Sequence, residues 1–84
     1  MQNHPSQNLT LSDVKTGEHA VFINIQAEKA VASRLTSLGF TPGVMIEMNQ
    51  NYGHGPLVVN IRGTRVALGR HEAQSIQVQK DGIK

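Results

Sequence analysis

Short stretches in which apolar and polar residues alternate recur along this chain, and glycine or proline residues separate them. A two-residue period places every second side chain on the same face of a β-strand, so each stretch predicts a strand with one buried face. The predicted strands are residues 18–25, 44–49, 57–62, 65–68 and 76–78. An open sheet of such strands would expose hydrophobic edges, so we expect a mostly β fold of about five strands, mainly antiparallel, that curl into a small barrel.

The first predicted strand carries apolar residues on both faces. Val21, Ile23 and Ile25 share one face by the two-residue period. Phe22 lies between them, and we expect it in the core because large aromatic side chains are rarely left in solvent.

Between the first two strands the apolar residues fall three or four positions apart, which is the spacing of one face of an α-helix. This face consists of Ala27, Val31, Leu35 and Leu38. We expect both leucines to fill the core. Gly39 follows at a position where a helix commonly ends in a left-handed residue, and Phe40 can then pack back on the last turn. The sequence therefore predicts one short amphipathic helix inserted after the first strand.

Glycine and proline also predict the tight turns. Residues 41–43 suit a type II turn, because Pro42 sets one backbone angle and Gly43 accepts a positive φ. Glycine at the first position of Gly63-Thr64 predicts a type II′ hairpin of two residues. Residues 70–74 are long enough for only one helical turn.

Length and composition limit the classes of protein that remain. A chain of 84 residues with 38% hydrophobic and 17% charged residues is typical of one small globular domain. The absence of cysteine excludes disulfide frameworks and thiolate sites, and it fits a cytoplasmic location. No apolar run approaches the roughly 20 residues needed to cross a bilayer, so we expect no membrane insertion. We expect a flexible polar leader at 1–8, a barrel domain at 9–79 and a loose tail at 80–84.

Within the helix end and the following turn, Arg34-Leu35, Leu38-Gly39-Phe40 and Pro42-Gly43 resemble the signature of the FeoA family. The segments 55–59 and 65–68 resemble the second half of that pattern, and the resemblance covers residues 9–79. It implies an SH3-like β-barrel that accompanies the bacterial ferrous-iron transporter FeoB. The same barrel also ends iron-dependent transcriptional repressors, but no DNA-binding domain precedes it here, so we do not expect a repressor.

The resemblance further implies a non-enzymatic accessory or regulatory protein that binds the cytoplasmic, GTP-binding part of FeoB. The candidate partner-binding residues are Arg34, Phe40, Met45, Tyr52 and His54. We expect the helix end at 34–41 and the loop at 49–56 to be movable contact elements. Met45 and Val58 face away from the inferred core, and they could form an apolar patch beside Tyr52. Arg34 has an alternative role, because its guanidinium could bond carbonyls or a carboxylate of its own chain.

We assign no catalytic residue, no metal ligand and no cofactor. The serines lack an adjacent base, the six acidic residues are dispersed, and the four histidines lack the spacing by which a helix presents two metal ligands.

Two alternative functions stay open. A metal-responsive domain would act through its histidines, namely His19, His54 or His71. A nucleic-acid-binding barrel, which we favour less, would use its basic side chains, namely Arg62, Arg65 and Arg70. The oligomeric state is also open.

Overall fold

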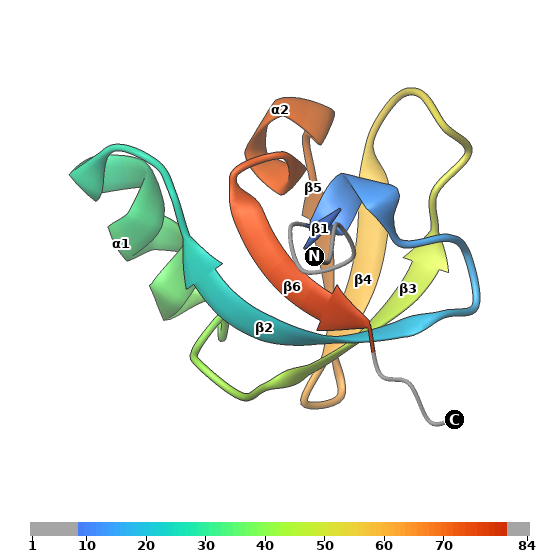
Figure 1. Ribbon diagram of the computed structural model, residues 1–84, viewed down its shortest axis with the longest axis horizontal. Helices are drawn as coiled ribbons and strands as arrows, with labels where there is room; N and C mark the ends of the chain where they lie inside the picture. Colours follow the sequence, from blue (N-terminus) through green and yellow to red (C-terminus); the bar gives the residue numbers. More distant parts are fainter. Residues whose placement is uncertain (1–8, 81–84) are drawn as a thin grey trace, which may run out of the picture.

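Six strands form one antiparallel sheet in the computed structural model, which describes residues 9–80 (Figure 1). The strands lie in the order β1-β6-β2-β3-β4-β5, and every neighbouring pair is antiparallel. Their bounds are β1 Leu9–Thr10, β2 His19–Ile25, β3 Met45–Gln50, β4 Leu57–Ile61, β5 Thr64–Leu68 and β6 Ile76–Lys80. The mostly β architecture predicted from the sequence is confirmed, with β1 as a short strand that the sequence pattern did not predict.

Short helical segments connect the strands. They are the 3-10 turn η2 Leu11–Asp13, the helix α1 Lys29–Ser37 and the single turn α2 Arg70–Ala73. None of these is long and apolar enough to span a membrane, within the described part of the chain. The predicted leader at 1–8 and residues 81–84 of the predicted tail lie outside the described residues, whereas Lys80 is the last residue of β6.

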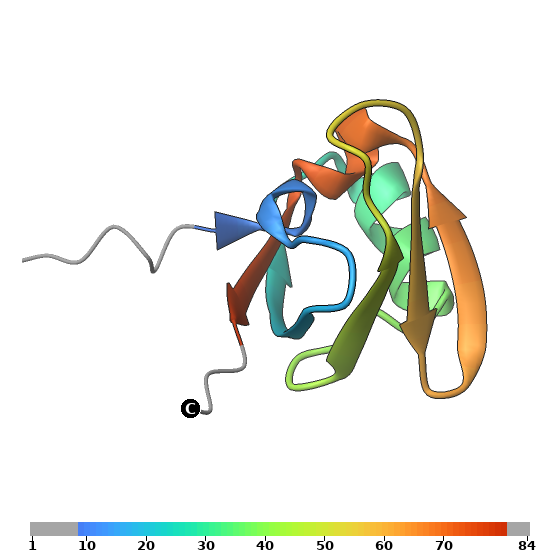
Figure 2. The same ribbon diagram turned by 90° about the vertical axis from the view of Figure 1, so that its right-hand side faces the viewer.

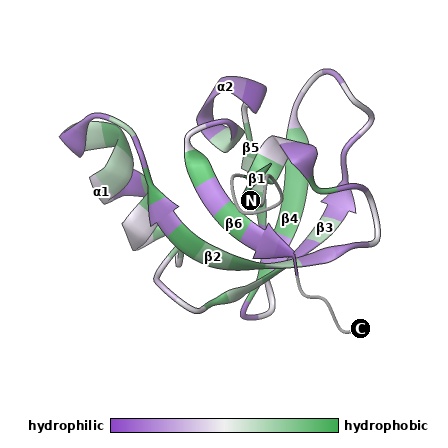
Figure 3. Ribbon diagram, in the orientation of Figure 1, coloured by the Kyte–Doolittle hydropathy of each residue, from purple (hydrophilic) through white to green (hydrophobic). Residues whose placement is uncertain are grey.

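The sheet curls into two layers, with β1, β6 and β2 on one side and β3, β4 and β5 on the other (Figure 2). β1 and β5 end the strand order without pairing with each other in residues 9–80, so the barrel is open along one seam. Along the strands hydrophobic and hydrophilic residues alternate (Figure 3). Buried apolar side chains from η2, both helices and β2 to β6 meet in a single core.

A bulge in β2 changes which of its residues face this core. Phe22 pairs with Val78 and is 3% exposed, but the register shifts before Asn24, and Ile25 then packs against the core. Ile23 is left 42% exposed. The prediction that Val21, Ile23 and Ile25 share one face is therefore wrong, because one extra residue in the strand reverses the alternation.

The helix α1 ends as the sequence predicted. Gly39 has a φ of 115°, its N–H donates to the carbonyl of Thr36, and the N–H of Phe40 donates to the carbonyl of Leu35 over 3.2 Å. These two bonds form a Schellman motif, which folds Phe40 back into the core at 1% exposure. Leu35 is buried as expected, but Leu38 is 39% exposed because Phe40 takes the core position at the helix end.

The start of α1 differs from the prediction. Glu28 is its N-cap, so the predicted apolar face begins outside the helix, at the exposed Ala27. Ala27 has the spacing of the helical face, but it lies in the segment that connects β2 to α1.

Two tight turns precede strands of the second layer, one between α1 and β3 and the other between β4 and β5. Val44 N–H donates to the carbonyl of Thr41 over 3.0 Å, and Gly43 has a φ of 87°, which confirms the predicted type II turn. The β4–β5 turn is displaced by one residue from its predicted position, because Ile61 pairs with Thr64. Its central residues are Arg62 and Gly63, with φ values of 54° and 82°, which makes it type I′ instead of the predicted type II′.

Candidate partner-docking surface

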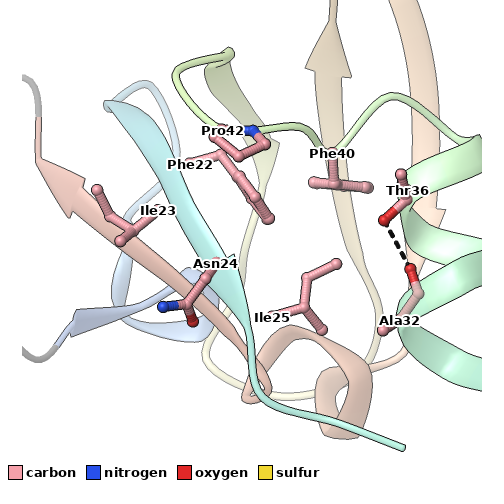
Figure 4. Close-up of a pocket in the computed structure, with 8 residues that line it drawn as sticks. All are labelled: Phe22, Ile23, Asn24, Ile25, Ala32, Thr36, Phe40 and Pro42. Carbon is pink, nitrogen blue, oxygen red and sulfur yellow. Dashed lines mark hydrogen bonds between the residues drawn. The ribbon is translucent and has the colours of Figure 1, made fainter. Parts of the chain in front are cut away.

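A groove of about 270 Å³ lies between α1 and β2 (Figure 4). Its lining is mostly apolar and consists of Phe22, Ile23, Asn24, Ile25, Ala32, Thr36, Phe40 and Pro42. The groove exists because α1 presents the small side chains of Ala32 and Thr36 toward β2. A helix carrying leucine at these positions would fill the space.

The chemistry of the groove is that of a hydrophobic contact site. The rings of Phe22 and Phe40 lie 6.2 Å apart between centroids and form its floor. The hydroxyl of Thr36 donates to the carbonyl of Ala32 over 2.8 Å, so this polar group is already satisfied within the helix (Figure 4). Phe40, a predicted partner-binding residue, is almost fully buried, and it can contribute only through this floor.

An exposed apolar patch lies on the outer face of β2 and β3. Met45 is 43% exposed, as predicted for an outward-facing residue, and it pairs with the half-buried Val21. Ile23 follows Val21 on the same strand and also lines the groove. We call Val21, Ile23 and Met45 the β2–β3 patch. The predicted patch of Met45 and Val58 beside Tyr52 does not form, because Met45 begins β3 whereas Tyr52 lies in the loop beyond the other end of that strand, roughly 20 Å away along the extended chain.

The loop between β3 and β4 is held at its base by Asn51. The side chain of Asn51 donates to the carbonyls of Ser12 and Val14 over 3.1 and 2.7 Å. Its oxygen accepts hydrogen bonds from the N–H of Gly53 and from the guanidinium of Arg70. No local pattern in the sequence marks Asn51, since its partners in the other segments lie 19 or more positions away.

The tip of this loop stays exposed. Tyr52 is 69% exposed, and His54 is exposed as well. Arg70 also donates to the carbonyl of Gly55 over 3.2 Å, so the loop is bonded to α2 on both sides of its tip. The predicted movable contact element is therefore an exposed tip on a hydrogen-bonded base.

Three of the four arginines proposed from the sequence as binding residues make internal contacts. Arg34 forms a salt bridge with Glu72 and so connects α1 to α2. Arg62 donates to the hydroxyl of Thr41 over 3.4 Å, and Arg70 holds the loop. Of the three arginines grouped in the nucleic-acid alternative, only the exposed Arg65 makes no side-chain hydrogen bond or ion pair among residues 9–80.

A second cavity of about 360 Å³ lies between the start of α1 and α2. Glu28, His71 and Glu72 line it together with uncharged residues. No group of three histidine or acidic side chains converges in a way that would hold a metal ion in the described part of the chain. His19 and His54 belong to β2 and to the β3–β4 loop, so the structure does not bring the three candidate histidines together.

The sequence model of the FeoA domain matches residues 9–80. The chain belongs to the FeoA family. A candidate Fe(2+) transport protein A of Methanocaldococcus jannaschii is 30% identical over 69 residues, covering 82% of this chain and 83% of that protein. Its counterpart in Campylobacter jejuni is 28% identical over 71 residues, covering 83% of this chain and 96% of that protein.

Solved FeoA structures share the fold. The zinc complex of Stenotrophomonas maltophilia FeoA, described as a prokaryotic SH3 domain protein, has a TM-score of 0.77 and 36% identity and covers 84% of this chain and 89% of that one. A manganese-dependent transcriptional repressor is 22% identical with a TM-score of 0.78, and this chain covers 41% of its length, so the two share the fold alone. The SH3-like fold that the resemblance implied is confirmed.

Proposed function

We propose that this FeoA-family chain is a non-enzymatic accessory or regulatory protein of ferrous-iron uptake. It acts in the cytoplasm by binding the cytoplasmic part of a FeoB-type transporter. Membership of a family whose curated relatives are named for Fe(2+) transport supports the process. The Stenotrophomonas maltophilia FeoA is described as a candidate activating factor of bacterial ferrous-iron transport, which is consistent with an accessory role.

The observation that carries the proposal is the apolar surface formed by the groove and the β2–β3 patch. Ile23 and Met45 are each more than 40% exposed on a domain with a well-formed core. Large apolar side chains that gather at the surface are typical of protein-interaction sites. Tyr52 and His54, at the tip of the β3–β4 loop, provide a second candidate contact with the partner. Binding residues are often carried by loops that a rigid scaffold holds in place.

The test is a titration of the ¹⁵N-labelled protein with the cytoplasmic GTP-binding part of FeoB from the same organism. It is followed by backbone amide shifts with GDP and with a GTP analogue. We expect saturable shifts that cluster on one face of the barrel, and an unrelated GTP-binding domain serves as the control. Absence of any saturable shift in both nucleotide states would overturn the proposed partner.

A metal-responsive function makes a different prediction in the same assay. Anaerobic addition of Fe²⁺ without FeoB would then shift the side-chain resonances of at least two of His19, His54 and His71 at stoichiometric metal. Docking on a protein partner requires no such shift.

A further inference from the structure

We infer that the α1–β2 groove receives an apolar side chain from an acidic segment of the partner. This inference rests on the proposed function and specifies the surface that the docking uses. It assigns the chemistry of the partner segment, namely a large aliphatic or aromatic residue flanked by carboxylates.

The size and lining of the groove suit an inserted side chain. Its volume of about 270 Å³ falls just below the roughly 300–1,000 Å³ typical of small-molecule sites. No charged residue lines it, and the hydroxyl of Thr36 is satisfied by Ala32. A polar ligand would therefore find few hydrogen-bond partners, whereas an apolar side chain would bury surface against Phe22 and Phe40.

The backbone of β2 beside the groove is already hydrogen-bonded within the chain at Phe22. Phe22 donates its N–H to the carbonyl of Val44, and its carbonyl accepts from the N–H of Gly43. A partner strand therefore cannot pair with β2 at this position. Insertion of a side chain from outside requires no free backbone there.

Cationic side chains flank the groove at both ends. Lys29 lies one helical turn before Ala32, on the same side of α1. Arg62 reaches the hydroxyl of Thr41, the residue immediately before Pro42 at the other end. The ion pairs among residues 9–80 are Arg34–Glu72 and Glu18–Lys80, so neither flanking cation is neutralised by a carboxylate of the described chain. This charge arrangement favours a segment with acidic flanks.

The test compares matched variants in the FeoB titration. Ile23→Ser removes an apolar side chain at the groove, and Leu38→Ser removes one of similar exposure, 39% against 42%, that does not line it. We expect Ile23→Ser to weaken docking about tenfold and Leu38→Ser to change it less than about twofold. Thermal unfolding of both variants checks that each remains folded.

A second pair of variants tests the interior of the groove. These variants add a side chain instead of removing one, so they do not take away an apolar contact of the domain itself. Ala32→Glu places a carboxylate in the groove, whereas Ser33→Glu places one at the next, exposed position of the same helix. We expect the first to lower the affinity at least tenfold and the second to leave it within about threefold.

The charge component has its own matched controls. Lys29→Gln and Arg62→Asn should each weaken docking about two- to fivefold at low salt, and the difference should shrink as salt is added. Asparagine is chosen at position 62 because it tolerates the positive φ of that residue. Lys15→Gln and Arg65→Asn, at exposed basic residues away from the groove, should have smaller effects.

The outcomes separate the two proposals. Saturable docking that is unaffected by Ile23→Ser and Ala32→Glu would overturn the groove and leave the proposed function standing. Equal losses of affinity in the groove variants and in their matched controls would also overturn the groove as the docking site. Self-association of the wild-type protein that Ile23→Ser abolishes would identify a second copy of the chain as the occupant and overturn the acidic partner segment. Absence of docking by the wild-type protein would remove the proposed function and this inference together.

Discussion

Asn51 shows how much one residue can contribute to this small domain. Its side chain joins the Ser12 to Val14 segment, the β3–β4 loop and Arg70 of α2 through four hydrogen bonds. The backbone N–H of Asn51 also donates to the hydroxyl of Thr16 over 2.9 Å. A single amide thus holds together three segments that are remote in sequence.

We expect Asn51→Ala to lower the free energy of unfolding by about 2–4 kcal/mol, because it leaves part-buried carbonyls and the Arg70 guanidinium without their partner. Urea denaturation followed by circular dichroism measures the change. Asn24→Ala removes the same group at an exposed position, and it should cost less than about 0.5 kcal/mol. Equal costs for the two variants would contradict the role of Asn51.

The carboxylate of Glu18 makes the stability of the folded state depend on pH. The backbone N–H of Lys15 donates to its carboxylate over 2.8 Å, and Lys80 lies 3.1 Å from it. The hydrogen bond from Lys15, and then the contact with Lys80, lower the pKa of Glu18 below its ordinary value of 4.5. The folded state therefore binds this proton less tightly than the unfolded state does, and the resulting stability is present above pH 4.5 and lost as the pH falls below it.

We expect Glu18→Gln to flatten this acid-induced loss. Urea midpoints of the wild type and of the variant, measured from neutral pH to below pH 4.5, give the two slopes. The exposed Glu47→Gln is the control, and it should keep the slope of the wild type. Parallel curves for Glu18→Gln and the wild type would refute the effect.

At the scale of elements, α1 is attached to the sheet by few contacts. Leu35 is its only fully buried residue, Phe40 anchors the segment after its end, and the salt bridge between Arg34 and Glu72 joins it to α2. Arg34 is 54% exposed, and an ion pair so open to solvent contributes at most about 1 kcal/mol. Burial of Leu35 therefore dominates the placement of α1, and with it the shape of the groove.

Leu35→Ala should lower the free energy of unfolding by about 2–5 kcal/mol, since it removes a fully buried side chain and leaves a cavity. Leu38→Ala, three residues further on, should cost less than about 1 kcal/mol because that side chain is already half-exposed. Chemical denaturation of the two variants gives the comparison. A larger cost at Leu38 would mean that the helix packs through its other side.

For the whole molecule, the decisive feature is that both layers and both helices share one core. No second cluster of buried residues stands apart from it in residues 9–80, so no element is expected to unfold by itself with a separate core. We expect a single urea transition in which amide signals of α1 and of β4 disappear with the same midpoint. An earlier midpoint for α1 would show that the helix detaches first and that the groove is a dynamic site.

The structural features that were correctly predicted depend on residues close together in the sequence. Gly39, Pro42 and Gly43 determine their backbone conformations within a few residues, and the alternation in β3 and β4 needs no distant partner. Among the candidate site residues, Met45 was correctly predicted to face outward. Tyr52 is exposed at the loop tip, Phe40 lies in the floor of the groove and Arg34 is paired within the chain.

Local sequence specified five of the six strands, the helix α1 with its end, and the family, because capping, turn formation and alternation depend on neighbouring residues. The tertiary structure alone sets which side of β2 faces the core, since the bulge arises from pairing with β6. It also decided the candidate docking site. Ala32 and Thr36 are ordinary small helix residues in the sequence, and they form a groove only because the fold places β2, Phe22 and Phe40 opposite them.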